Sequence, residues 1–586
     1  MTRKGILRRK PISFDTTLRN PERIPQFISV LSEFENQLLT SEVALSIEAE
    51  IIRQKIFEPT QQTMGTYVKK YSGKFHFIAK DLSDNAEQNV SELYTEWSNN
   101  EKGVLSREQV IYLLQNTITA HKEAGWEGGW ESRLHTQFNF LNELGLVIVA
   151  KNKIIKISEV GKLMIKNYNQ GYRIPNSDLC FEKSAFLMAF AKYQTNNPYR
   201  SNTIKVNFFS LVLNTIKELK HIYKRKGLAI NDLPFVIVWN NNDYKTLAKF
   251  IHQFRDEFGY NCSSTLVYEY AMNFLDEQKE KLILCKARKS FIEEKQQDYK
   301  IEKITKETPD EIVRKLRLTQ LVSLKGNANF LDLNSNESDK IEYICNKFNI
   351  NKEFDSAENY FEYLNKIENT LLFKSDVTYF GKHGEEKQKL ISLLAKELEW
   401  NALKTEMKLT VSKKGSQYEH FKYIPEPARL EFLSAIALRK ALPNVIIIPN
   451  YISDDTGYPY NTAKGMSINS SGADIELIEN TIYATCEPTL SSASQYQAVN
   501  EIPAIVDHLF KIYDNKKVNI TDLFSIFLVP KITDRANNAI AEVKHSQNVH
   551  IYAWQVDDFI EFSKSVKSLS DYKSQRAYTK RRVMAY

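Results

Sequence analysis

Residues 473–489 predict a β-hairpin, and this element constrains the fold of the chain more than any other. The stretch contains two short runs of strand-forming residues separated by Asn480 and Thr481. Asparagine tolerates the positive φ that a two-residue hairpin turn requires. A turn at this dipeptide fixes the register of the two strands, so that Ile475 lies opposite Cys486 on an apolar face.

The other face of this hairpin carries two acids. The same register places Asp474 opposite Glu487, with their Cβ atoms roughly 5 Å apart. Like charges in this position destabilise a sheet unless something compensates them. A divalent metal would do so, because Mg²⁺ is typically held by one or two carboxylates together with water and substrate phosphate. The alternative is a solvated pair of acids on an exposed hairpin.

The composition indicates a globular protein of several domains. A chain of 586 residues is too long for one core, and about three or four domains are expected. The net charge of +7 permits nucleic-acid binding without requiring it. The five cysteines show no paired spacing, which favours a reducing, cytoplasmic location over a disulfide framework or a zinc ribbon. No apolar run approaches the length of a membrane span, so no membrane association is expected.

Residues 106–168 have the pattern of a winged helix-turn-helix. A helix over about 131–144 is followed by two short strands, a tight turn between them, and a further helix. In this plan the helix before the wing lies in the major groove of DNA. Arg133 and Gln137 are the polar residues near its start, and Arg to guanine and Gln to adenine are standard base contacts. The alternative is a winged helix that serves only for packing or dimerisation.

The same plan recurs over residues 309–345. Two copies of one unit predict that residues 1–335 form a DNA-recognition region of winged-helix-like subdomains. Residues 336–400 are charged and helical and are expected to form a linker. From 401 to 586, strands alternate with helices, which predicts an α/β/α domain with a mixed sheet. The expected fold class is therefore multidomain α+β.

Three further residues can complete a site around Asp474 and Glu487. Glu431 lies on a predicted helix beside small apolar residues, which favours a buried acid over a solvated one. If that helix packs beside the hairpin, the three carboxylates form a pocket that favours Mg²⁺ or Mn²⁺ over zinc. Such a metal suits phosphodiester hydrolysis. Thr489 can orient water, and His508 is either a catalytic imidazole or a structural one.

Two nucleotide cofactors are not expected. The sequence contains no phosphate loop of the Gly-x4-Gly-Lys-Ser/Thr type, so no ATP requirement is predicted. It also has no glycine-rich methyl-donor loop, which argues against S-adenosylmethionine and a fused methyltransferase.

The acidic motif resembles a known nuclease signature. Asp474, a gap of twelve residues and then Glu487-x-Thr489 is similar to the PD-(D/E)XK motif, with threonine where lysine usually stands. This variant resembles the AlwI-type family of type IIS restriction endonucleases, which includes strand-specific nicking endonucleases. Further stretches that resemble the family are 19–24, 31–35, 132–164, 240–255, 321–334 and the pattern of strands and helices after Leu523.

The resemblance implies an N-terminal recognition half, a helical linker and a C-terminal cleavage domain. It implies binding to a short asymmetric duplex site and Mg²⁺-dependent hydrolysis a few base pairs outside it. Glu431, Asp474 and Glu487 match the family's acidic positions, and His508 matches an active-site histidine that follows a proline. Pro488 stands where the family often has valine. Because proline cannot donate to a ladder, the strand is expected to end or to lie at a sheet edge there.

The expected partners follow from this reading. Double-stranded DNA is the substrate, and a separately encoded DNA methyltransferase is expected in the same system. The sequence leaves open whether one or both strands are cut, and whether cutting both takes a transient dimer or a second subunit. The alternative from another class is a sequence-specific winged-helix regulator with a catalytically inactive α/β domain, against which the presence of all three acids counts.

Overall fold

The structure is a computed structural model whose chain divides into two compact units. Unit 1 comprises Met1–Ser323 and Leu331–Thr378, and unit 2 comprises Leu324–Phe330 and Tyr379–Tyr586. The structure describes residues 9–14, 21–61, 76–79, 84–118, 129–173, 180–200, 202–276, 284–326, 328–373, 385–418, 421–422, 424–463, 472–515 and 520–573. In these ranges no helix combines the length and the apolar character needed to cross a membrane.

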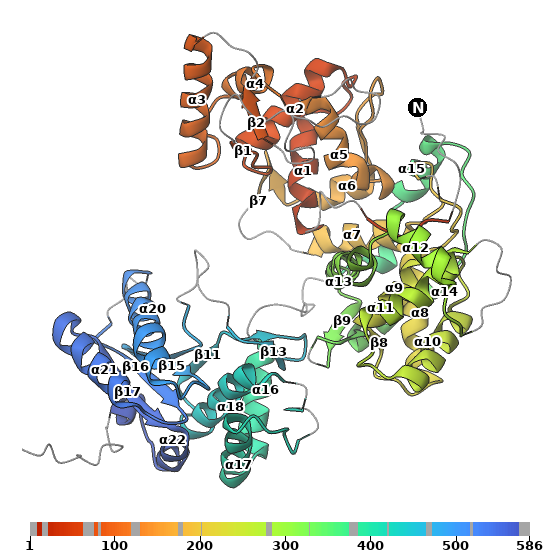
Figure 1. The fold of residues 1–586 in the computed structure, drawn as a ribbon. Helices are drawn as coiled ribbons and strands as arrows, with labels where there is room; N and C mark the ends of the chain where they lie inside the picture. Colours follow the sequence, from red (N-terminus) through yellow and green to blue (C-terminus); the bar gives the residue numbers. More distant parts are fainter. Residues whose placement is uncertain are drawn as a thin grey trace, which may run out of the picture. The chain divides into compact units, whose positions relative to one another are not determined.

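Unit 1 is mainly helical (Figure 1). Its α-helices are α1 (Ile24–Leu31), α2 (Ser41–Arg53), α3 (Asp84–Asn99), α4 (Arg107–Gln115), α5 (Trp130–Glu143), α6 (Glu159–Met164), α7 (Cys180–Lys192), α8 (Phe208–His221), α9 (Leu233–Ile237), α10 (Tyr244–Phe258), α11 (Ser264–Ala271), α12 (Lys289–Asp298), α13 (Thr308–Leu318), α14 (Ser338–Lys347) and α15 (Ala357–Asn365). Its strands are short and form small sheets: β1 (Thr60–Gln61), β2 (His76–Ala79) and β3 (Thr117–Ile118); β4 (Val147–Ile148) and β5 (Lys156–Ile157); β6 (Tyr168–Asn169) and β7 (Tyr172–Arg173).

The predicted order of elements between 106 and 168 is confirmed. Ser106 caps α4 through a complete capping box, and Ser158 caps α6 by accepting from the backbone of Gly161. Gly145 ends α5 with a φ of 62°, in the left-handed region where glycine carries no steric cost. Between these helices, β4 and β5 form an antiparallel pair with Asn152 at a φ of 59° in the turn.

The second predicted copy also has its expected elements. Helix α13 is followed by β9 (Val322–Lys325) and β10 (Phe330–Leu333), which form a sheet with β8 (Leu228–Ala229) in the order β8-β10-β9. Asn334 then accepts from the backbone of Asn336 and begins a short 3-10 helix.

The turn between β9 and β10 belongs to unit 2. Asp455 holds it there, because its backbone N donates to the carbonyl of Leu324 at 2.9 Å and its carboxylate accepts from the Leu324 backbone N at 2.6 Å. The helical stretch expected over 336–400 is divided between the units: α14 and α15 lie in unit 1, and α16 (Glu385–Glu397) lies in unit 2.

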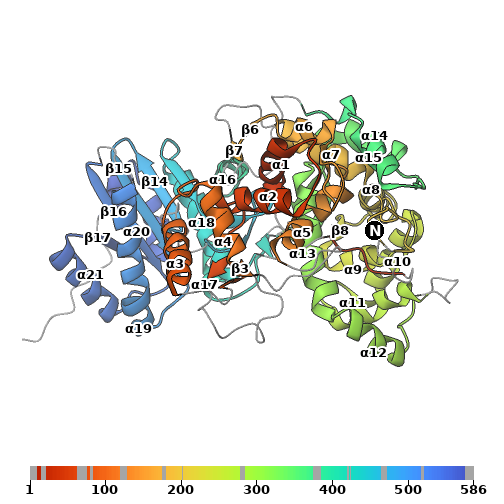
Figure 2. The ribbon, with the colours of Figure 1, turned by 90° about the horizontal axis from the view of Figure 1, so that it is seen from above.

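Unit 2 is built on a five-stranded mixed sheet. Its order is β11-β14-β15-β16-β17, with β11 (Ile446–Pro449), β14 (Ile475–Glu479), β15 (Ile482–Pro488), β16 (Asp522–Val529) and β17 (His550–Gln555). The first two pairings are antiparallel and the last two are parallel. Figure 2 shows β14 to β17 side by side. The prediction of a mixed α and β fold with a mixed sheet is therefore confirmed.

Helices cover both faces of this sheet (Figure 1). One face packs against α16, α17 (Trp400–Val411), α18 (Glu426–Ala441) and α22 (Val556–Ser563), in a core that includes Ile475, Ala484, Cys486 and Ile526. The other face packs against α20 (Ile502–Asn515) and α21 (Asp534–Gln547), with Phe527 and Ile551 in a second core. Unit 2 also contains a hairpin of β12 (Ile452–Ser453) and β13 (Pro459–Asn461).

Candidate active site

The hairpin of β14 and β15 has the predicted register. Ile475 pairs with Cys486 and Leu477 with Ala484, and all four side chains are buried. Asn480 has a φ of 56° in the turn, as the two-residue connection requires. The apolar face predicted from the sequence is therefore confirmed residue by residue.

Asp474 and Glu487 lie together at the start of this hairpin. The backbone N of Asp474 donates to Oε2 of Glu487 at 3.2 Å, and Glu487 is only 5% exposed. Burial raises the pKa of Asp474 well above its usual range, and the charges of Glu487, Glu431 and Glu501 raise it further. Glu487 is buried and Asp474 is half-buried beside it, unlike the solvated pair of an exposed hairpin, so that alternative is wrong.

Glu431 is a buried acid on α18, as its apolar neighbours indicated. Its side chain is 3% exposed, and Oε2 accepts from the backbone N of Ala463 at 3.1 Å. Burial raises the pKa of Glu431 to about 8; the charge of Glu487 also raises it, and that of Lys387 lowers it. Glu431 is therefore within electrostatic reach of the hairpin acids.

The acids come from opposite sides of the sheet. Ala484 and Cys486 pack in the core beside α18, so Glu487, one residue further along β15, points to the other face. There it meets α20. In the described ranges, no three side chains of His, Cys, Asp or Glu are arranged to hold one metal ion. A metal pocket of Glu431, Asp474 and Glu487 stays a prediction, and a donor set of carboxylates that repel one another fits a hard divalent cation.

His508 on α20 contacts Glu487. Its Nδ1 lies 3.2 Å from Oε1 of Glu487, and its side chain is 14% exposed. When Nδ1 carries a proton it donates to the carboxylate, which orients the ring. The structure thus brings His508 next to one of the predicted acids, although its role is not tested by this contact.

Thr489 follows the end of β15. Proline at 488 does end the strand, but β15 lies in the interior of the sheet between β14 and β16, so the alternative of an edge position is wrong. The Thr489 hydroxyl donates to Oε1 of Glu501 at 2.8 Å and accepts from the backbone N of Ser491 at 3.2 Å.

Glu501 and Lys387 were not predicted as site residues. Glu501 ends the π-helix η9 (Gln497–Glu501), and burial raises its pKa, with the charge of Glu487 adding to the effect. A sequence signal existed for Glu501, because it lies seven residues before His508 and so falls on the same helix face. Lys387 on α16 acts on Glu431 through its charge, and no local pattern connects these distant positions.

The two residues predicted to read bases are buried in unit 1. Arg133 is 6% exposed with its guanidinium 4.8 Å from the ring centre of Phe57, and Gln137 is fully buried and donates to Glu48 at 3.0 Å. Base contact by this pair stays a prediction, and it would require both side chains to leave these positions.

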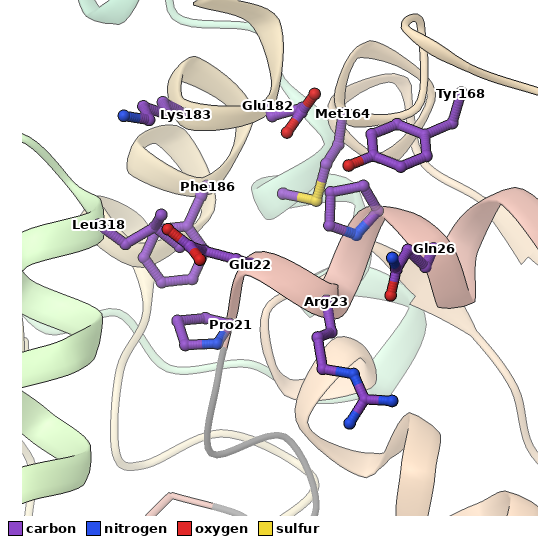
Figure 3. A pocket seen from close by; sticks show the side chains of 11 residues that line it. Pro21, Glu22, Arg23, Gln26, Met164, Tyr168, Glu182, Lys183, Phe186 and Leu318 are labelled. Atoms are coloured by element: carbon purple, nitrogen blue, oxygen red, sulfur yellow. The ribbon is translucent and has the colours of Figure 1, made fainter. Parts of the chain in front are cut away.

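Unit 1 also contains a pocket between α1, α7 and α13 (Figure 3). Its lining includes Glu22 and Glu182 as well as Arg23 and Lys183. Figure 3 shows the two basic side chains pointing in different directions, so they do not form one cluster of positive charge. Its mixed charges distinguish it from the carboxylate cluster of unit 2.

A family model described as AlwI restriction endonuclease matches residues 142–379 and 394–550 of this chain. These segments make up more than half of the 586 residues. The chain belongs to the AlwI restriction endonuclease family. It is therefore a site-specific endonuclease. The site residues described above all lie in the second matched segment: Glu431, Asp474, Glu487, Glu501 and His508.

Three solved structures are similar to this AlwI-family chain. The small subunit of the heterodimeric restriction endonuclease R.BspD6I has 19% identity over 30% of this chain and 78% of its own, with a TM-score of 0.21. Restriction endonuclease FokI has 12% identity over 93% and 94%, with a TM-score of 0.21. FokI bound to DNA has 12% identity over 96% and 98%, with a TM-score of 0.18. A comparison with curated proteins finds no match.

Proposed function

We propose that this AlwI-family protein is a type IIS restriction endonuclease. It binds a short asymmetric sequence in double-stranded DNA and hydrolyses phosphodiester bonds a few base pairs outside that sequence, on one or both strands. The observation that carries the proposal is the contact between Asp474 and Glu487 at the start of the hairpin, with the buried Glu431 near enough for its charge to act on them, in a domain with a mixed sheet. This arrangement of acids supports a PD-(D/E)XK-like cleavage domain.

Unit 1 is proposed as the recognition part of the enzyme. The segment around α5 has the order of a winged helix and supports this division of labour. The second such segment begins with α13 in unit 1, and its turn belongs to unit 2. Unit 2 is proposed as the cleavage part, because the acids and His508 belong to it. A separately encoded methyltransferase would protect the same site in the cell's own DNA, and the enzyme would cut unmodified DNA in the cytoplasm.

Asp474 and Glu487, with Glu431, would hold Mg²⁺, or Mn²⁺ in its place. When bound, the ion would supply charge neutralisation at the scissile phosphate. Burial and neighbouring negative charges disfavour the ionised forms of Glu431 and Asp474 and raise their pKa values, and a bound cation would relieve this repulsion.

The remaining polar groups of the site can transfer a proton or orient a water molecule. In the tautomer that carries its proton on Nδ1, His508 donates to Glu487, which leaves Nε2 of the imidazole to accept a proton from water. Thr489 is fixed by its bond to Glu501 and can orient water only through its remaining lone pair. We assign His508 as the general base of the proposed reaction.

Sequencing of DNA ends tests this function. The purified protein is incubated with long unmethylated DNA and Mg²⁺, with EDTA as the control. A type IIS enzyme gives ends at a fixed offset from one shared asymmetric word, and a nicking enzyme gives them on one strand only. Ends inside a palindromic word, or ends scattered without a shared word, would contradict the proposal.

A further inference from the structure

Lys387 lies on α16, beside the outer edge of the sheet. Its Nζ donates to the carbonyl of Pro449 at 3.1 Å and to the carbonyl of Tyr451. The next residue, Gln388, donates to the carbonyl of Ile447. The three acceptors alternate along the chain, as expected for carbonyls on the unpaired side of edge strand β11. Helix α16 therefore covers this edge with two side chains.

The segment that Lys387 holds is the one that positions Asp474. Asn450 lies between the two acceptors of Lys387, and its backbone N donates to the carbonyl of Asp474 at 2.8 Å. The Asn450 side chain donates to the carbonyl of Ala473 at 2.7 Å. Lys387 thus fixes one side of residues 449–451, and the other side fixes the backbone of a predicted catalytic acid.

Lys387 also acts on Glu431. Burial lowers the pKa of Lys387 to about 8, and the charge of Glu431 raises it; in return, Lys387 lowers the pKa of Glu431. The Nζ lies 4.7 Å from the ring centre of Tyr451, which adds a favourable contact for a cation. Lys387 therefore holds the segment that contacts the backbone of Asp474, and it acts on Glu431 through its charge.

Lys440 provides a matched comparison. It too donates to a backbone carbonyl, that of Ala395 at 2.9 Å, and its Nζ lies 5.8 Å from the ring centre of Trp400. It lies nine residues beyond Glu431 on α18, which corresponds to about 13 Å along the helix. Both lysines bind a backbone carbonyl of a neighbouring segment. Lys387 differs because the segment that it binds also contacts the backbone of Asp474.

We propose that Lys387 is a positioning residue for DNA cleavage: it clamps residues 449–451, which in turn hold the backbone of Asp474. The inference rests on the proposed nuclease function. It assigns to α16 a part in arranging the acids, in addition to covering the sheet edge.

The test compares the full-length wild type with Lys387→Met, Lys387→Arg and Lys440→Met. Single-turnover cleavage is measured with enzyme in excess, and the DNA Kd is measured in EDTA. Loss of the charge-assisted bonds in Lys387→Met should slow cleavage by at least about tenfold. The DNA Kd should stay within about twofold, because recognition is assigned to unit 1. Lys387→Arg, which keeps the charge and the donors, should cleave within about fivefold of the wild type, and Lys440→Met should cleave normally.

Hydrogen exchange of the metal-free protein gives a readout that does not depend on cleavage. Lys387→Met should accelerate exchange in peptides covering 446–451 and 473–477, whereas Lys440→Met should not. Unchanged exchange there, or normal cleavage by Lys387→Met, would overturn the proposal. If Lys387→Met unfolds unit 2 as a whole, Lys387→Arg decides: normal exchange with slow cleavage would overturn it as well. If the wild type cleaves no DNA, the proposed function fails, and the exchange data still test the clamp.

Discussion

Replacing Glu431 by glutamine should stabilise the metal-free protein while it abolishes cleavage. The pKa of Glu431 rises from 4.5 to about 8 on folding, because the side chain is buried. An acid whose pKa is raised in the folded state contributes most stability below pH 4.5, and that contribution is lost as the pH rises towards 8. At pH 7 the loss amounts to about 3 kcal/mol of the free energy of unfolding. Glutamine cannot ionise, yet its oxygen can still accept from the backbone N of Ala463.

The assay is thermal unfolding in EDTA at pH 5 and pH 7. About 3 kcal/mol corresponds to a rise of roughly 6–12 °C for a unit of the size of unit 2. Glu431→Gln should show this rise at pH 7 and a much smaller one at pH 5. Glu542→Gln, an exposed acid on α21, is the control and should change stability by less than about 0.5 kcal/mol. A Glu431→Gln variant that is less stable than the wild type at pH 7, or whose gain does not depend on pH, would refute the reasoning.

Three further perturbations test other parts of the structure. His508→Ala removes the bond to Glu487 and should slow single-turnover cleavage by about 10–100-fold at unchanged DNA Kd; an unchanged rate would show that the histidine is only structural. Asn480→Val places a branched residue at a φ of 56° and should cost about 1–2 kcal/mol in urea unfolding, whereas Asn480→Gly should change little; equal effects would contradict the turn geometry. Gly161→Ala brings a Cβ to 2.5 Å from a backbone carbonyl and should lower the melting temperature of unit 1, while Gly415→Ala, which meets nothing within 4 Å, should not.

The hairpin could be predicted from sequence because its determinants are local. Asn480 supplies the turn, and the alternation of Ile475 and Leu477 sets the face, so the pairing with Cys486 and Ala484 follows. The expected burial of Glu431 likewise needed only its neighbours on one helix. The division of the sheet into two covered faces followed from the alternation of strands and helices.

Contacts between distant segments could not be predicted in this way. Lys387 contacts the carbonyls of Pro449 and Tyr451 because α16 packs along the edge of β11, and no spacing in the sequence predicts that packing. Arg133 and Gln137 were predicted to contact bases from their position on α5. That position does not show which face of the helix another element covers. In the structure Glu48 and Phe57 cover that face.

The most direct test of the central claim separates DNA binding from cleavage with one substitution. Asp474→Asn is compared with the wild type and with Asp507→Asn, a change at an exposed aspartate of the same unit. Binding is followed by footprinting in EDTA, and cleavage by the appearance of mapped ends in Mg²⁺. If the acids of unit 2 cut DNA that unit 1 recognises, Asp474→Asn keeps the wild-type footprint and loses cleavage, and Asp507→Asn keeps both. Cleavage by Asp474→Asn at the wild-type rate would contradict the account.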